Sequence, residues 1–139
     1  MRHMLIVEDE RDICDCLQEF FGSKGFKCSS AFSGEEALHK LEEETRKPDV
    51  ILLDILLPGL SGIEVLKKVK DLHPQARVVM VTALDREDLR LQARRYGACG
   101  YVTKPFDFSS STWAPILQSA PIPIPVAPSA PPPAPLPPV

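Results

Sequence analysis

Hydrophobic residues in this chain gather in three short runs that contain no polar position. The runs cover residues 4–7, 50–53 and 78–81. A half-exposed strand alternates apolar and polar residues, whereas an uninterrupted apolar run is typical of a strand covered on both faces. Two shorter or more polar segments, residues 27–32 and 101–103, fit strands at the edges of the same sheet.

Helical spacing of apolar residues marks the segments between these strands. The predicted helices cover residues 11–21, 35–44, 63–72 and about 86–96. Two of them have a start signal, because Ser33 is followed by Glu36 and Ser61 by Glu64, each a Ser-x-x-Glu capping box. The predicted order is therefore β-α-β-α-β-α-β-α-β.

Strict alternation with short loops predicts an α/β fold with a parallel sheet, right-handed crossovers and helices on both faces. Placing the two weaker strands at the edges gives the order 2-1-3-4-5. This is the flavodoxin-like, doubly wound arrangement of five strands. Ligands of such sheets bind at the carboxyl ends of the strands, beside the switch point between strands 1 and 3.

Proline usage divides the chain into two unlike pieces. There are 15 prolines in 139 residues, and 11 of them lie between Pro115 and Pro138. We expect a domain over residues 1–106 and a Ser-rich, then Pro-rich tail or linker over residues 107–139. A domain of that length buries enough surface to form one core without disulfides or structural metal.

Charge and cysteine content exclude several functional classes. The 19 acidic and 16 basic residues are well mixed, with a net charge of −3, so we expect no direct nucleic-acid binding. No apolar run has the length of a membrane span, and no signal peptide precedes the first strand, which predicts a cytoplasmic protein without membrane contact. The four cysteines lack paired spacing and are expected to be reduced and mostly buried.

Polar residues follow the predicted strands at their carboxyl ends. Glu8 and Asp9 follow the first strand, Asp54 the third, Thr82 the fourth and Lys104 the fifth. These side chains should converge on one edge of the sheet. Clustered carboxylates repel one another unless a cation compensates their charge, and oxygen ligands in an open site favour Mg²⁺.

From residue 4 to residue 106 the chain closely resembles the receiver domain of two-component response regulators. The matching motifs are residues 7–9, 54–62, 81–83 and 97–106. The resemblance implies that Asp54 accepts a phosphoryl group from a phosphohistidine on a sensor histidine kinase or phosphotransfer protein. It also implies that Asp9, Asp54 and the Leu56 carbonyl hold Mg²⁺, which Glu8 reaches through water.

The same resemblance assigns roles to the remaining site residues. Thr82 and Lys104 would grip the phosphoryl oxygens, and the Lys104-Pro105 bond would be cis. On phosphorylation Thr82 would move toward the phosphoryl group and Tyr101 would rotate into the vacated space, which would control an output partner. The chain would be a signalling domain that promotes only its own phosphorylation and slow dephosphorylation, and not an enzyme.

The sequence departs from the receiver pattern after Phe106, where a fifth amphipathic helix is usual. Prolines predict that this helix is truncated or absent. Trp113, Ile116 and Leu117 have the spacing of one helical face. We expect them to dock where the fifth helix would lie, on their own chain or on a second copy in a homodimer.

Other functional classes compare less well. A flavin carrier needs glycine or hydroxyl donors after the first strand, where this chain has Glu8 and Asp9. The main alternative is a degenerate receiver or scaffold whose proline-rich tail is the interaction element. The complete set of acidic, threonine and lysine residues favours the phosphoacceptor interpretation.

Overall fold

Strands and helices alternate along the whole described part of the chain. A computed structural model describes residues 2–117, with side chains to residue 114. The strands are β1 (Arg2–Val7), β2 (Phe26–Ala31), β3 (Val50–Leu53), β4 (Arg77–Thr82) and β5 (Gly100–Thr103). The helices are α1 (Arg11–Ser23), α2 (Gly34–Glu43), α3 (Gly62–Leu72), α4 (Glu87–Arg95) and α5 (Ser110–Leu117).

The five strands form one parallel sheet in the order β2-β1-β3-β4-β5, which confirms the predicted topology. The register brings the carboxyl ends of neighbouring strands level: Val7 pairs with Leu53, and Leu53 pairs with Met80. Residues that directly follow β1 and β3 therefore lie next to each other at one edge. At the same edge Thr82 pairs with Thr103, so Lys104 begins beside the end of β4.

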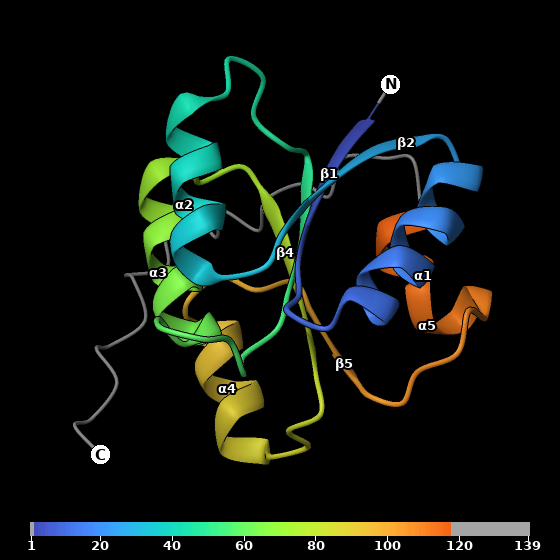
Figure 1. The fold of residues 1–139 in the computed structure, drawn as a ribbon. Coiled ribbons are helices and arrows are strands. Elements are labelled where there is room, and N and C mark those ends of the chain that lie inside the picture. The colour runs from blue at the N-terminus through green and yellow to red at the C-terminus, as the bar shows by residue number, and fades with distance from the viewer. Residues whose placement is uncertain (1, 118–139) are drawn as a thin grey trace, which may run out of the picture.

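Helices cover both faces of the sheet, with α1 and α5 on one side and α2, α3 and α4 on the other (Figure 1). Alternate residues of each strand point into different cores. In β1, Leu5 and Val7 join the core under α2, α3 and α4, while Met4 and Ile6 join the core under α1 and α5. The apolar runs of the sequence lack alternation for this reason, because both faces are buried.

The two predicted capping boxes start their helices in the structure. The Ser33 hydroxyl accepts a hydrogen bond from the Glu36 amide at 3.1 Å, and Ser61 accepts one from Glu64 at 3.4 Å. Gly97 follows α4 with a φ of +101°, a backbone conformation that residues other than glycine rarely adopt. The two serines therefore fix where α2 and α3 begin, and Gly97 allows the turn after α4.

The fifth helix is present and short, which agrees with truncation and rules out its absence. Trp113 of α5 is fully buried, and its ring makes edge contacts with Phe21 at 5.2 Å and Phe106 at 5.3 Å between centroids. The predicted docking of Trp113 on its own chain is thus confirmed. The side chains of Ile116 and Leu117 lie outside the described part, as do residues 118–139 of the tail.

All four cysteines are free, as expected, but Cys16 and Cys99 are exposed and only Cys14 is fully buried. The expectation of mostly buried cysteines was wrong, because Cys16 lies on the outer face of α1 and Cys99 lies in the turn before β5.

Among residues 2–117, no helix is both long enough and apolar enough to cross a membrane.

Candidate functional site

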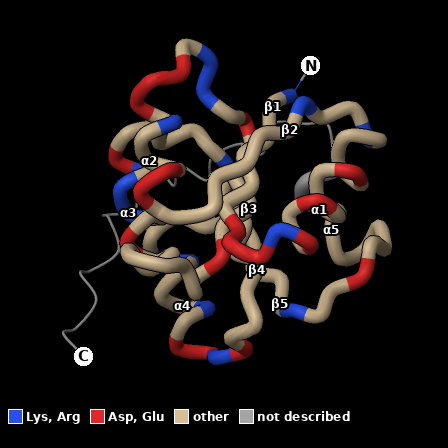
Figure 2. Tube along the Cα trace, viewed as in Figure 1, with Lys and Arg blue, Asp and Glu red and all other residues tan. Residues whose placement is uncertain are grey.

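Acidic residues lie where β1 and β3 end, and a basic residue follows β5 (Figure 2). Glu8, Asp9 and Asp54 each offer a carboxylate oxygen, and these oxygens lie within 4.8 Å of one another. Glu8 is 2% and Asp54 4% exposed, whereas Asp9 is open to solvent. The structure thus brings the three predicted carboxylates into one cluster with a buried base and an open rim.

Lys104 offsets part of the negative charge in the buried part of this cluster. Its Nζ lies 2.5 Å from Glu8 Oε1 and 2.9 Å from Asp54 Oδ2. The side chain is 10% exposed, and the Lys104 amide donates to the Thr82 carbonyl at 2.8 Å, which fixes the residue beside β4. The Lys104-Pro105 bond is cis, as the resemblance implied.

Electrostatics in the cluster reflect burial and shared charge. Burial raises the pKa of Glu8, and the nearby Asp54 charge adds to the rise, although hydrogen bonds from Lys104 and from the Glu10 amide act against it. For Lys104, burial alone would lower the pKa, but the hydrogen bonds to Glu8 and Asp54 outweigh it, and the pKa is raised. Lys104 therefore carries its charge throughout the physiological range.

The loop after β3 fixes the Asp54 carboxylate. The Leu56 amide donates to Asp54 Oδ1 at 3.1 Å, so the two carboxylate oxygens have different partners. The Gly62 amide closes the loop by donating to the Ile55 carbonyl at 2.8 Å. A Cβ at Gly62 would lie 2.0 Å from the Asp54 carbonyl oxygen, so this close approach requires glycine.

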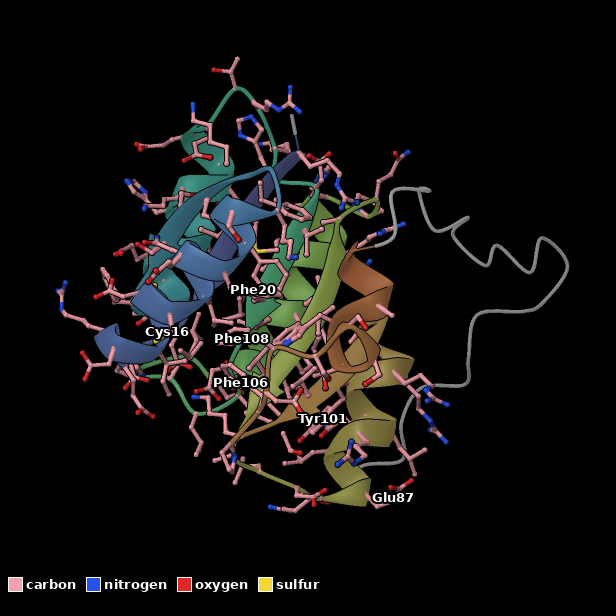
Figure 3. The ribbon with its side chains drawn as sticks, turned by 90° about the vertical axis from the view of Figure 1, so that its right-hand side faces the viewer. Cys16, Phe20, Glu87, Tyr101, Phe106 and Phe108 are labelled. Atoms are coloured by element: carbon pink, nitrogen blue, oxygen red, sulfur yellow. The ribbon has the colours of Figure 1, made fainter. Side chains whose placement is uncertain are left out.

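Thr82 and Tyr101 are joined through the loop between β4 and α4. The buried Thr82 hydroxyl accepts a hydrogen bond from the Leu84 amide at 3.3 Å. The Tyr101 hydroxyl donates to the carbonyl of the same residue, Leu84. Tyr101 is half-buried on β5 beside α4 (Figure 3). The residues expected to act as a switch are therefore connected by two hydrogen bonds.

Glu10 is a site residue that the sequence reasoning missed. Its carboxylate lies 3.8 Å from Lys104 Nζ, and its amide donates to Glu8 Oε2 at 3.1 Å. The signal was present in the sequence, since Glu10 is the third acid of a run that starts at Glu8. The run alone does not single out Glu10, because an acidic residue next to the start of a helix is also favoured by the helix dipole.

This arrangement suits a divalent cation and a phosphorylated substrate. Three carboxylates of which one is exposed form the hard oxygen ligand set that Mg²⁺ prefers. A fixed, nearly buried carboxylate can act as a nucleophile, and an ammonium beside it can offset negative charge on transferred oxygens.

Comparisons with known proteins agree with this geometry. The sequence model of the family described as "Response regulator receiver domain" matches residues 4–112. "Response regulator SaeR" of Staphylococcus epidermidis is 37% identical over 106 residues, which cover 76% of this chain and 45% of that protein. The chain thus spans about half the length of this curated relative.

Solved structures share the fold. The "CheX-CheY-BeF3-Mg+2 complex from Borrelia burgdorferi" matches with a TM-score of 0.73 and 34% identity, over 76% of this chain and 80% of that chain. A response regulator from Burkholderia pseudomallei "with a phosphorylated aspartic acid, calcium ion and citrate" matches with a TM-score of 0.75 and 27% identity, over 86% and 68% of the two chains.

Proposed function

The chain belongs to the response regulator receiver family, and we propose that it takes a phosphoryl group onto Asp54 and passes the event to a partner as a change of conformation. One observation carries this proposal. Lys104 bridges the buried carboxylates of Glu8 and Asp54 at the carboxyl ends of the strands, and ligands of sheets with this topology generally bind at that edge.

The proposed reaction uses Asp54 as the nucleophile. One of its carboxylate oxygens attacks the phosphorus of a phosphohistidine, the P–N bond breaks, and the electron pair of that bond returns to the imidazole of the donor. The product is an acyl phosphate on Asp54. Because the transition state is loose and its charge lies on the equatorial oxygens, positioning and charge neutralisation supply most of the catalysis.

Lys104 and Thr82 are the groups that would meet those oxygens. The Lys104 ammonium already lies 2.9 Å from Asp54, so it stands where negative charge arrives. The Thr82 hydroxyl accepts from the Leu84 amide and therefore keeps its own proton for donation to a phosphoryl oxygen. The positions of Lys104 and Thr82 and the chemistry of their side chains support both roles.

The carboxylate cluster fits Mg²⁺. Asp9, Asp54 and the Leu56 carbonyl would hold the ion, with Glu8 reaching it through water. When bound, Mg²⁺ supplies positive charge that offsets the phosphoryl oxygens and the carboxylates. The exposure of Asp9 leaves an entry path for the ion.

The proposed donor is a sensor histidine kinase or a histidine phosphotransfer protein. The acyl phosphate would draw Thr82 toward it, and Tyr101 would follow because both side chains contact Leu84. An output partner, or a second copy of the chain, would read the new position of Tyr101. The proline-rich tail lies outside the described residues, and no contact of the described part favours it as the interaction element.

The test is labelling by a small phosphodonor. With Mg²⁺ and acetyl phosphate, intact mass spectrometry should show the addition of one phosphoryl group, and Asp54→Asn should abolish it. Asp71→Asn, which changes an exposed aspartate on α3, is the matched control and should label like the wild type. A folded wild-type sample whose mass does not change at saturating donor would contradict the proposal.

A further inference from the structure

We propose that Arg90 is a positioning residue that holds Tyr101 against the loop between β4 and α4, and so opposes the movement of Thr82 toward the phosphoryl group. This inference rests on the proposed function. It assigns a role to a residue of α4 that has no part in the carboxylate cluster. Arg90 would act on the reaction only through Tyr101 and Leu84.

Two contacts place the Arg90 guanidinium. It lies over the Tyr101 ring, with Cζ 4.6 Å from the ring centroid, and it forms an ion pair with Asp85. The Arg90 side chain is 34% exposed and that of Asp85 is 71% exposed. An ion pair so open to solvent contributes little stability, whereas a cation over a half-buried ring contributes more. Asp85 therefore orients the guanidinium, and the ring contact restrains Tyr101.

The restraint reaches Thr82 in two steps. The Tyr101 hydroxyl donates to the Leu84 carbonyl, and the Leu84 amide donates to Thr82 Oγ1 at 3.3 Å. Arg90 is thus connected to the loop at two points. It pairs directly with Asp85, and it reaches Leu84 through the hydroxyl of Tyr101. Movement of Thr82 toward a phosphoryl group must therefore displace Leu84 and Tyr101, and the contacts of Arg90 resist that displacement.

A cavity beside Tyr101 leaves its ring room to move. It has a volume of about 170 Å³ and lies between α4 and β5. Its lining includes Arg90, Arg94, Ala98 and Tyr101 itself. The Tyr101 ring has space to move on this side, and the guanidinium over its face limits that movement. Removal of the Arg90 side chain would enlarge the cavity and would also release the Tyr101 ring.

The chain offers a matched control for this test. Arg94 is on the same helix, one turn after Arg90, and lines the same cavity. Arg90→Ala and Arg94→Ala each remove one positive charge from α4, but only the first removes the cation over Tyr101. Arg90→Lys keeps the charge and loses the planar stacking group, so it should give an intermediate result.

The experiment titrates the full chain with beryllofluoride, an analogue of the phosphoryl group, in saturating Mg²⁺, and follows binding by ¹⁹F NMR. Because Arg90→Ala removes a restraint on the arrangement without a phosphoryl group, it should bind the analogue about three- to tenfold more tightly than the wild type. Arg94→Ala should bind it like the wild type. Affinity for Mg²⁺ alone, measured by calorimetry, should be unchanged in both variants because the carboxylate cluster is intact.

A double-mutant cycle tests whether the effect passes through Tyr101. In a Tyr101→Ala background the ring contact is already lost, so Arg90→Ala should change the affinity for beryllofluoride by less than twofold. Equal changes in affinity for Arg90→Ala and Arg94→Ala, or the same change with and without Tyr101, would overturn the proposal, and so would weaker binding by Arg90→Ala. A lowered urea midpoint with unchanged affinity would also overturn it, since that result indicates a purely structural role. Failure of the wild type to bind beryllofluoride would instead contradict the proposed function.

Discussion

Two buried carboxylates share one ammonium at the centre of the site. Lys104 contacts both Glu8 and Asp54, so each carboxylate has a partner, yet the three groups together carry one net negative charge before Asp9 and Glu10 are counted. Burial of charge is costly unless the charge is balanced. The site is therefore short of positive charge in the absence of a metal ion.

The excess of negative charge at the site should make the free energy of unfolding depend on pH through Glu8. Its pKa is raised above the usual 4.5, mainly by burial, so the folded protein binds its proton more tightly than the unfolded chain does. The stability that this proton provides is complete below pH 4.5 and is lost as the pH rises through the raised pKa. In metal-free buffer, the free energy of unfolding of the wild type should fall over that range relative to Glu8→Gln.

Urea denaturation at a series of pH values measures this difference. Glu42→Gln, at an exposed position of α2, serves as the control and should follow the wild type. Parallel profiles for the wild type and Glu8→Gln would show that burial does not perturb the carboxyl group.

At the scale of elements, the start of α3 sets the loop that carries Asp54. A Cβ at Gly62 would overlap the Asp54 carbonyl, whereas a Cβ at Gly22 of α1 meets no atom within 4 Å. Gly62→Ala should therefore displace the loop, lower stability and slow labelling by acetyl phosphate. Gly22→Ala should stabilise the protein by about 0.4–1 kcal/mol, because alanine reduces the freedom of the unfolded chain.

Both glycine variants are compared by urea denaturation and by the rate of labelling. We expect Gly62→Ala to lower the stability and Gly22→Ala to raise it. Only Gly62→Ala should slow labelling. Normal labelling by a folded Gly62→Ala protein would mean that the loop moves without cost.

The short helix α5 owes its position to one side chain and one turn. Trp113 packs in the core under α1, and its indole donates to the Asp107 carbonyl at 2.6 Å. Asp107 Oδ1 in turn accepts from Ser109 and Thr112, which closes the turn before the helix. Phe108 adds a stacked contact on Phe20 at 4.5 Å (Figure 3).

Trp113→Ala should destabilise the protein by about 3–5 kcal/mol, the range for removal of a large buried aromatic side chain. Ser111→Ala, at an exposed position of the same helix, should change stability by less than about 0.5 kcal/mol. Urea denaturation followed by far-ultraviolet circular dichroism measures both. A small effect of Trp113→Ala would mean that the face beside α1 is covered in another way.

The elements were predictable to different degrees for physical reasons. The bounds of β3 match the prediction because its four apolar residues are buried on both faces and no polar residue intervenes. The site at the strand ends followed from topology, which fixes where chain segments meet. The turn at Asp107, the contact of Arg90 with Tyr101 and the part played by Glu10 did not follow, since they depend on side-chain directions that no local pattern encodes.

For the whole molecule, a cation that binds the carboxylate cluster should stabilise the fold. A ligand that binds only the native state adds RT ln(1 + [L]/Kd), which is about 2.7 kcal/mol at a hundredfold excess over Kd. Mg²⁺ should therefore raise the urea midpoint. Asp9→Asn should reduce this response, and because Asp9 is exposed, the metal-free protein should stay folded.

Asp71→Asn is again the control and should respond to Mg²⁺ like the wild type. Identical unfolding curves with and without saturating Mg²⁺ would remove the metal ion from the proposed mechanism.

The sheet also separates the chromophores of the protein. The chain has one tryptophan, and Trp113 lies in the core under α1 and α5, while both tyrosines, Tyr96 and Tyr101, pack on the side of α2, α3 and α4. Near-ultraviolet circular dichroism distinguishes tyrosine bands from tryptophan bands. The two layers of the molecule are therefore optically distinct without any label, so a rearrangement confined to β5 and α4 can be told apart from a loosening of α5 in a single spectrum.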